Sequence, residues 1–407
     1  MLEPQSIGFF ILLIAVFGGL MWLLMATRSW PVRIVAACLA FIPAMAFGVA
    51  AVNRYYDYYQ TWGSAIADIT NQGPAAPTGP TTVSKPSVES GLLAGRYVDI
   101  ALARQQGYTL PLMVHGQYSK ITRIVYVFLP PQYFWPGYQK YRFPAIELIH
   151  GFPGTPQDWI TVLGVNSVLD TLVREHRARP AVLVMPDANG GRGISLQCLN
   201  QVHGPPDATF LARDLPAYIA GGLRVQPPGS GWGIAGYSEG GFCAANLGLQ
   251  DGRVFSYAGV LSGYFRPSDN QLANPSRQVS PFGGNRGLQR VNTPLDLLRS
   301  LPIGRLIPQF WLGAGLLDGP DVRNAESFGQ LLQLRQPAVT IKLVRGGGHS
   351  MLTWRQLLPP MLGWMTNGLA QQVSRYESRP IRGGRTPVAA AARHARRLEL
   401  QARRRRR

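Results

Sequence analysis

Cysteine, histidine and acidic residues are all scarce in this chain of 407 residues, which has three cysteines, six histidines and 21 acidic residues. Cys38, Cys198 and Cys243 show none of the close spacings that zinc sites use. No pair of histidines has metal-ligand spacing together with suitable carboxylates. We therefore predict no metal and no cofactor. The sequence also shows no internal repeat.

Basic residues outnumber acidic ones, and the formal net charge is +19. A charge of this size can indicate a nucleic-acid partner. However, residues 375–407 alone contain twelve arginines and two glutamates, which accounts for +10 of the total. The rest of the chain is only moderately basic. Because the basic tail belongs to a part of the chain that we expect to be exported, we predict no nucleic-acid binding.

Two long uncharged segments near the N-terminus, residues 8–26 and 34–52, are each long enough to cross a bilayer. Because only residues 27–33 separate them, we expect a transmembrane helical hairpin. Arg28 and Arg33 place the short connection in the cytoplasm by the positive-inside rule, so both flanks should lie outside. A signal peptide followed by a buried helix is the alternative, but the first segment is long for a signal peptide and lacks a basic start.

Composition divides the chain into four parts. Residues 1–62 form the hairpin and end in an aromatic run suited to the outer membrane interface. Residues 63–89 are a linker rich in Pro, Gly, Thr and Ser, residues 90–370 form one large domain, and residues 371–407 form an Arg-rich tail. We predict a multi-pass protein of the cell membrane with its large domain on the extracytoplasmic side. The tail is expected to be disordered, and the alternative is contact with anionic lipid or a cell-wall polymer.

The large domain alternates between predicted strands and predicted helices after Pro130. Strands are predicted at 145–150, 181–186, 231–237, 255–262, 309–314 and 339–345, and helices at 165–176, 208–223, 239–250, 321–335 and 351–368. Such alternation predicts a mostly parallel sheet with helices on both faces. Segments 97–101 and 124–129 are predicted to be strands of an antiparallel opening. Residues 264–306 break the alternation and are predicted to be an irregular insertion that caps the site.

The most informative segment is residues 236–240, which has the pattern G-x-S-x-G between a predicted strand and a predicted helix. This pattern is typical of a nucleophile elbow, a sharp turn that lifts the serine hydroxyl above the sheet. The glycines are needed because bulkier side chains would clash around a strained serine. Ser238 is therefore the candidate nucleophile. A glycine-rich strand end with an incidental serine is the alternative, because a pentapeptide alone is a weak motif.

Two further strand ends carry the candidate acid and base. Asp318 follows the predicted strand 309–314 and is the candidate acid, with nearby Asp321 as its rival. His349 follows another strand and three glycines, which suits a general base. The order serine, aspartate, histidine is the order found in α/β-hydrolases.

A glycine-containing loop, HGFPG at 150–154, follows the strand predicted at 145–150. Acyl transfer needs backbone N–H donors that stabilise the tetrahedral oxyanion. The N–H groups of Phe152 and Glu239 are the candidate donors. His150 precedes the serine and is interpreted as a structural hydrogen-bonding residue.

The segments HGFPG, VMPDANGG, GYSEGG, LDGP and GGGHSMLTWRQLLPPMLGWM resemble the putative esterase family of the α/β-hydrolase fold. That family includes esterase D, enterochelin esterases and the mycobacterial antigen 85 mycolyltransferases. The resemblance covers roughly residues 90–370, and the hairpin resembles that of membrane-anchored actinobacterial esterases. It implies cleavage of an acyl ester, or transfer of its acyl group to an alcohol, with Ser238 as nucleophile, His349 as base and Asp318 as acid. Glu239 after the serine, and aspartate in place of glutamate as the acid, differ from antigen 85 and weigh against mycolyl transfer.

We therefore predict a membrane-anchored serine esterase that acts on a lipid or small acyl ester through a Ser-His-Asp triad and an acyl-enzyme. An acyltransferase that uses a sugar or lipid alcohol is the first alternative, and the 264–306 insertion would decide between them. A catalytically silent binding scaffold is the second, although no triad member is missing. In an exported domain, Cys198 and Cys243 either form a disulfide or remain buried thiols, while Cys38 should be unpaired.

Overall fold

The computed structural model describes residues 2–56, 58–69, 92–93, 98–191, 194–267, 281–302, 304–335 and 339–377. Most of the predicted linker, residues 268–280 of the predicted insertion and the tail after residue 377 lie outside the described residues.

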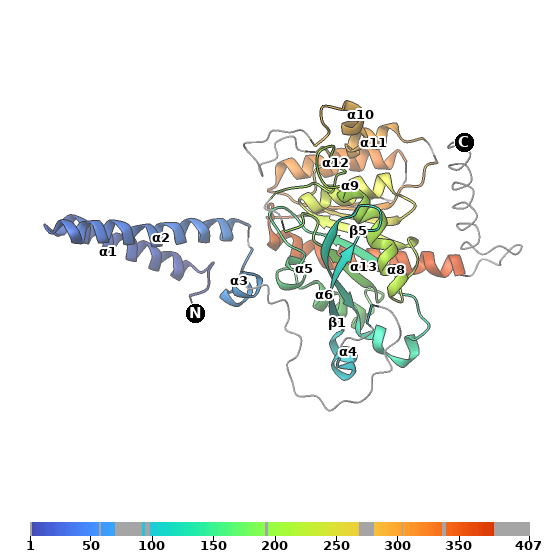
Figure 1. Cartoon of the computed structure of the whole chain (residues 1–407), viewed down its shortest axis with the longest axis horizontal. Coiled ribbons are helices and arrows are strands. Elements are labelled where there is room, and N and C mark those ends of the chain that lie inside the picture. The colour runs from blue at the N-terminus through green and yellow to red at the C-terminus, as the bar shows by residue number, and fades with distance from the viewer. Residues whose placement is uncertain are drawn as a thin grey trace, which may run out of the picture.

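An eight-stranded sheet forms the centre of the described domain, in the order β1-β2-β4-β3-β5-β6-β7-β8 (Figure 1). The strands are β1 (Tyr108–His115), β2 (Thr122–Leu129), β3 (Ala145–Ile149), β4 (Val182–Pro186), β5 (Gly229–Tyr237), β6 (Phe255–Leu261), β7 (Gln309–Gly315) and β8 (Thr340–Val344). The β1–β2 and β2–β4 pairs are antiparallel, and the remaining pairs are parallel. This topology confirms the predicted mostly parallel sheet with an antiparallel opening.

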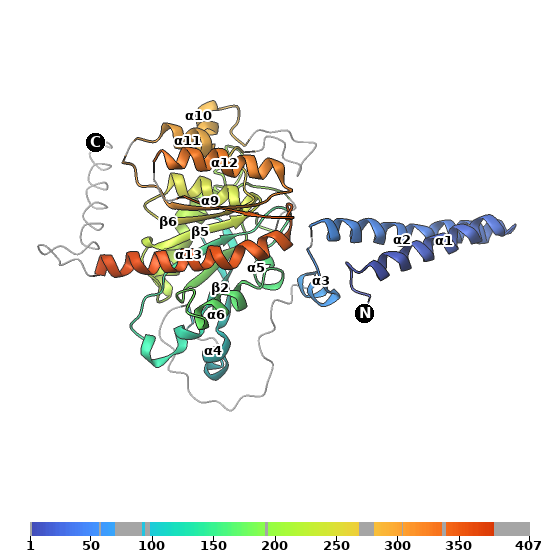
Figure 2. The same ribbon diagram turned by 180° about the vertical axis from the view of Figure 1, so that it is seen from behind.

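Helices cover both faces of the sheet, as Figure 2 shows from behind. They are α4 (Ile100–Gln106), α5 (Asp158–Thr161), α6 (Val165–Arg174), α7 (Asp207–Thr209), α8 (Leu215–Gly222), α9 (Glu239–Gln250), α10 (Arg286–Val291), α11 (Pro294–Ser300), α12 (Gly319–Gln333) and α13 (Met351–Glu377). The short 3-10 helices η1 (Pro131–Phe134) and η2 (Pro136–Tyr138) follow β2, and the π-helical turn η3 (Phe210–Asp214) joins α7 to α8. Successive side chains of β3 point to opposite faces of the sheet and enter two different hydrophobic cores. Ala145 and Ile149 belong to the core that includes α9 and α12. Ile146 and Leu148 belong to the core that includes α6 and α13.

Two local predictions were wrong. The predicted strand at 97–101 is replaced by the start of α4, because the Asp99 side chain accepts a hydrogen bond from the Leu102 N–H at 3.0 Å and caps the helix. The described part of the predicted irregular insertion contains α10 and α11. Asn285 caps α10 through the N–H groups of Gly287 and Leu288, which overrides the loop-like composition.

Three helices precede the domain: α1 (Ile7–Ala26), α2 (Trp30–Tyr56) and α3 (Trp62–Ile69). Helices α1 and α2 lie side by side and point away from the domain (Figure 1). Both are long and apolar enough to cross a membrane. Their domain-side ends are joined, since Arg54 of α2 donates to the carbonyl of Gln5, just before α1, at 2.5 Å. The N–H of Trp62, the first residue of α3, donates to Glu3 Oε2 at 3.0 Å.

Candidate active site

Ser238 lies in a strained turn between the end of β5 and the start of α9, with φ 55° and ψ −119°. Its N–H donates to the Leu261 carbonyl at 2.9 Å, which holds the turn on the sheet. A Cβ atom on Gly236 would lie 2.2 Å from the Gly240 backbone, and one on Gly240 would lie 2.0 Å from the Ile149 carbonyl oxygen. The turn therefore requires both glycines, as the sequence pattern predicted.

The hydroxyl of Ser238 lies 3.0 Å from Nε2 of His349, which belongs to the loop between β8 and α13. Nδ1 of the same ring lies 2.8 Å from Oδ2 of Asp318, after β7, and 2.8 Å from Oδ2 of Asp321, in the first turn of α12. The structure thus brings together the three predicted residues and also the rival acid, all at the carboxyl ends of parallel strands. Trp354 packs edge-on against His349, with ring centroids 5.1 Å apart.

The two aspartates differ in acidity. Burial raises the pKa of Asp318, but hydrogen bonds from His349 and Asp321 outweigh it and hold that pKa below its usual range. Burial and the neighbouring Asp318 instead raise the pKa of Asp321. Burial lowers the pKa of His349, but the two carboxylates outweigh it and raise the pKa to about 9. The site therefore stabilises the imidazolium, which is the charge that a serine–histidine pair must carry.

Asp318, Asp321 and His349 also form a group whose ligand atoms lie within 4.8 Å of one another, as a metal site would require. In this arrangement Nδ1 of His349 is bonded to both carboxylates and Nε2 to Ser238. Both ring nitrogens are thus already used in hydrogen bonds.

The predicted oxyanion loop lies directly against the elbow. A Cβ atom on Gly151 would lie 3.2 Å from Cβ of Ser238 and 2.8 Å from the ring of Tyr237. Phe152 is the next residue in this loop, and Glu239 is the first residue of α9. The backbone segments that carry the two candidate donors are therefore neighbours of Ser238 in sequence or in space.

A model of the family described as Putative esterase matches residues 119–365 of this chain. The chain belongs to this esterase family. The chain is 25% identical over 355 residues to an uncharacterised protein of Corynebacterium glutamicum, and the match covers 85% of this chain and 79% of that protein.

Solved structures show that the chain has the α/β-hydrolase fold. A ferulic acid esterase superposes with a TM-score of 0.56 at 20% identity, covering 65% of this chain and 99% of that chain. The fluorophosphonate-binding serine hydrolase F of Staphylococcus aureus superposes with a TM-score of 0.54 at 18% identity, covering 64% of this chain and 99% of that chain. MPT51 of Mycobacterium tuberculosis superposes with a TM-score of 0.50 at 17% identity, again covering 64% of this chain and 99% of that chain.

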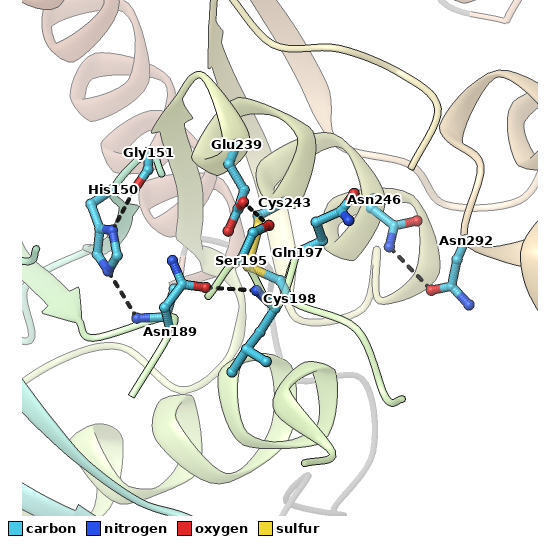
Figure 3. Close-up of a disulfide and its surroundings, with 12 residues drawn as sticks. His150, Gly151, Asn189, Ser195, Gln197, Cys198, Glu239, Cys243, Asn246 and Asn292 are labelled. Atoms are coloured by element: carbon cyan, nitrogen blue, oxygen red, sulfur yellow. Dashed lines mark hydrogen bonds between the residues drawn. A yellow bond between two sulfur atoms is a disulfide. The ribbon is translucent and has the colours of Figure 1, made fainter. Parts of the chain in front are cut away.

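A buried polar network supports the loop after β4 beside the elbow (Figure 3). His150 is fully buried, and its Nδ1 donates to the Gly151 carbonyl at 2.8 Å while its Nε2 accepts from the Ala188 N–H at 3.1 Å. Both ring nitrogens thus hold neighbouring backbone in place, which fits a structural role. Burial lowers the pKa of His150, but the neighbouring Asp187 and the Gly151 carbonyl outweigh it and raise that pKa. The side chain of Glu239 is buried and accepts a hydrogen bond from Ser195, and burial raises the pKa of Glu239.

Cys198 and Cys243 form a disulfide, with their sulfur atoms 2.10 Å apart (Figure 3). The bond joins the loop after β4 to α9, five residues beyond Ser238. Cys38 is free and exposed in α2. The sequence analysis missed Ser195, which has no recognisable motif around it.

Asp158 was not predicted from the sequence, and it is fully buried beneath the elbow. Its carboxylate accepts hydrogen bonds from the Tyr237 hydroxyl at 2.9 Å, from the Thr155 N–H at 3.0 Å and from the hydroxyl of Tyr58. The T-x-x-D spacing of Thr155 and Asp158 is a capping-box pattern and was an available signal. Tyr58 was expected only as part of an interfacial aromatic belt, yet it contacts the residue that supports the strand leading to Ser238.

Proposed function

We propose that this protein is a serine esterase in which Ser238 attacks the acyl carbon of a carboxylic ester. The observation that carries the proposal is the continuous hydrogen-bonded series from Ser238 through His349 to Asp318. Nε2 of His349 takes the serine proton as the C–O bond forms, and then gives it to the departing alcohol. Water, activated by the same nitrogen, then hydrolyses the acyl-enzyme and releases the acid.

Charge develops on the carbonyl oxygen in the tetrahedral intermediate, and we assign its stabilisation to the N–H groups of Phe152 and Glu239. Glu239 opens α9, so its N–H group also lies at the positive end of that helix dipole. The buried Glu239 side chain points elsewhere, into its hydrogen bond with Ser195. Its backbone and its side chain therefore serve different purposes in this proposal.

We further propose that α1 and α2 anchor the enzyme in the membrane as a helical hairpin. Arg28 lies in the connection between these helices and Arg33 in the first turn of α2, which favours a cytoplasmic connection and an extracytoplasmic catalytic domain. The aromatic residues that follow α2, Tyr58 and Trp62, are suited to the outer interface.

Acyl transfer is the second function that the same site supports, because water and an alcohol compete for one acyl-enzyme. The sequence resemblance to a family that includes mycolyltransferases favours this alternative, whereas the 17% identity to MPT51 indicates a shared fold alone. The two functions share the first half-reaction and differ only in which nucleophile reaches the acyl group.

Burst kinetics with a short-chain p-nitrophenyl ester test the proposal. We expect one equivalent of p-nitrophenolate in a rapid phase, and a loss of about 10⁴-fold or more in rate for Ser238→Ala and His349→Ala. Ser300→Ala, an exposed serine on α11, is the matched control. An unchanged rate in Ser238→Ala would overturn the mechanism, and ester products formed when alcohols are added would indicate transfer.

A further inference from the structure

The end of α2 is tied to the same edge of the domain as the candidate active site. Tyr58, two residues after α2, donates its hydroxyl hydrogen to Asp158, which also holds Tyr237 next to Ser238. The carbonyl of Tyr58 accepts from the Arg355 side chain at 3.5 Å. The chain that leaves the second apolar helix therefore reaches the support of the nucleophile without an intervening linker.

Three exposed leucines border the site at this edge: Leu316 is 46%, Leu317 is 75% and Leu352 is 51% exposed. The N–H groups of Leu316 and Leu317 donate to the carbonyls of Val344 and Gly347, so this pair lies against the loop that carries His349. We call Leu316, Leu317 and Leu352 the leucine rim.

Leu352 connects the leucine rim to the anchor. It lies in the first turn of α13, three residues after His349 and one helical turn before Arg355. Residues three apart lie on the same side of a helix, and Arg355 contacts Tyr58. Arg345, also exposed, follows β8 at the same edge and adds a positive charge that suits anionic headgroups.

The arrangement of the helices shows which way this edge of the domain faces. In Figure 2 the start of α13 and the end of α2 lie on the same side of the domain, and α1 and α2 extend away from that side. When α1 and α2 cross a bilayer, the edge that carries the site and the leucine rim consequently faces the surface of that bilayer. Exposed leucines beside a membrane anchor are stabilised by burial among headgroups and acyl chains.

We propose that the leucine rim docks on the bilayer that holds α1 and α2, and that the substrate is an amphiphilic acyl ester resident in that bilayer. The substrate part of this inference rests on the proposed esterase activity, whereas the docking part does not. The ester bond of an amphiphile lies between its chains and its headgroup, and docking of the rim brings the edge that carries Ser238 to this interface.

Quenching by spin-labelled lipid tests the docking. The full chain carrying Cys38→Ser is given one new cysteine, as Leu317→Cys, Leu352→Cys or Leu334→Cys, labelled with a fluorophore and reconstituted in anionic vesicles. Leu334 is the matched control because it is 80% exposed and follows α12, a helix that starts beside the site and runs to the opposite end of the sheet. We expect quenching at positions 317 and 352 to exceed that at 334 several-fold. Equal quenching at the three positions would overturn the docking.

Rates on two esters test the substrate class. The variants are Leu317→Ser/Leu352→Ser and the control Leu334→Ser, assayed on a long-chain fluorogenic ester dissolved in the vesicle bilayer and on a short water-soluble ester. We expect the ratio of bilayer to soluble rates to fall roughly tenfold in the double variant, since two leucine contacts with lipid are lost. An unchanged ratio would overturn the substrate class. Retained hydrolysis of the soluble ester by Ser238→Ala would instead overturn the proposed esterase mechanism and leave the quenching result standing.

Discussion

Replacing Asp318 by Asn should slow the reaction more than replacing Asp321, although both carboxylates lie 2.8 Å from the same nitrogen of His349. Asp318 has its pKa held low and remains ionised, while the pKa of Asp321 is raised by burial and by Asp318. The ionised carboxylate stabilises the imidazolium more strongly. The remaining aspartate should partly compensate in each single variant.

The magnitude follows from the pKa of His349, which the site raises from 6.5 to about 9. Each tenfold change in a protonation constant corresponds to ~1.4 kcal/mol, so the site stabilises the imidazolium by a net ~3 kcal/mol, which the carboxylates supply in addition to offsetting the burial of the ring. If Asp318 supplies about two thirds of this, Asp318→Asn should lower kcat/KM by roughly 30-fold and Asp321→Asn by roughly fivefold. The double variant should lose at least about 150-fold, the product of the two single losses.

The assay is the pH dependence of kcat/KM with a soluble ester. His349 must be neutral to accept the serine proton, so the wild-type rate should rise with pH until about 9. Removing either carboxylate destabilises the imidazolium, which should move the inflection to lower pH. Equal losses in the Asp318 and Asp321 variants, or a double variant no slower than Asp318→Asn, would refute this division of roles.

Three further predictions concern stability, each measured by urea unfolding. Cys198→Ser/Cys243→Ser should lower the free energy of unfolding by about 4 kcal/mol, because the disulfide closes a loop with a sequence separation of 45 and so restricts the unfolded chain. A loss below ~1 kcal/mol would contradict this. Glu147 is buried, neither of its carboxylate oxygens has a hydrogen-bond partner within the described residues, and burial raises its pKa well above 4.5. As the pH rises, the Glu147 carboxyl therefore ionises in the unfolded chain before it does so in the folded one, which destabilises the wild type. The stability of Glu147→Gln relative to wild type should grow by ~1.4 kcal/mol per pH unit above about 4.5. Equal stability differences at pH 5 and pH 7 would count against this. Tyr58→Phe should lower the free energy of unfolding by ~1–3 kcal/mol, because it removes a hydrogen bond to the buried Asp158 carboxylate. The exposed control Tyr55→Phe should change it by less than ~0.5 kcal/mol. Similar losses in the two variants would refute the role of Tyr58.

Sequence was sufficient for the parallel part of the sheet. The predicted strands at 145–150 and 309–314 agree within one residue with β3 and β7, because buried parallel strands are short apolar runs between polar loops. The elbow was equally predictable, since Gly236 and Gly240 leave no room for a Cβ atom.

Sequence was insufficient where a single capping residue or a distant contact decides the structure. Asp99 turns an apparently strand-like segment into the start of α4. Hydrogen bonding of both Asp318 and Asp321 to His349 depends on how β7, α12 and the 345–350 loop meet in space. The bond from Tyr58 to Asp158 joins residues 100 positions apart and has no signal in either local segment.

The most direct test of the central claim is to label the full chain with a fluorophosphonate probe and locate the adduct by mass spectrometry. The proposed mechanism predicts one adduct, on Ser238, that is absent in Ser238→Ala and strongly reduced in His349→Ala. The Ser300→Ala control should label like the wild type. A folded wild-type protein that is not labelled, or that is labelled at another residue, would contradict the assignment of Ser238 as the activated nucleophile.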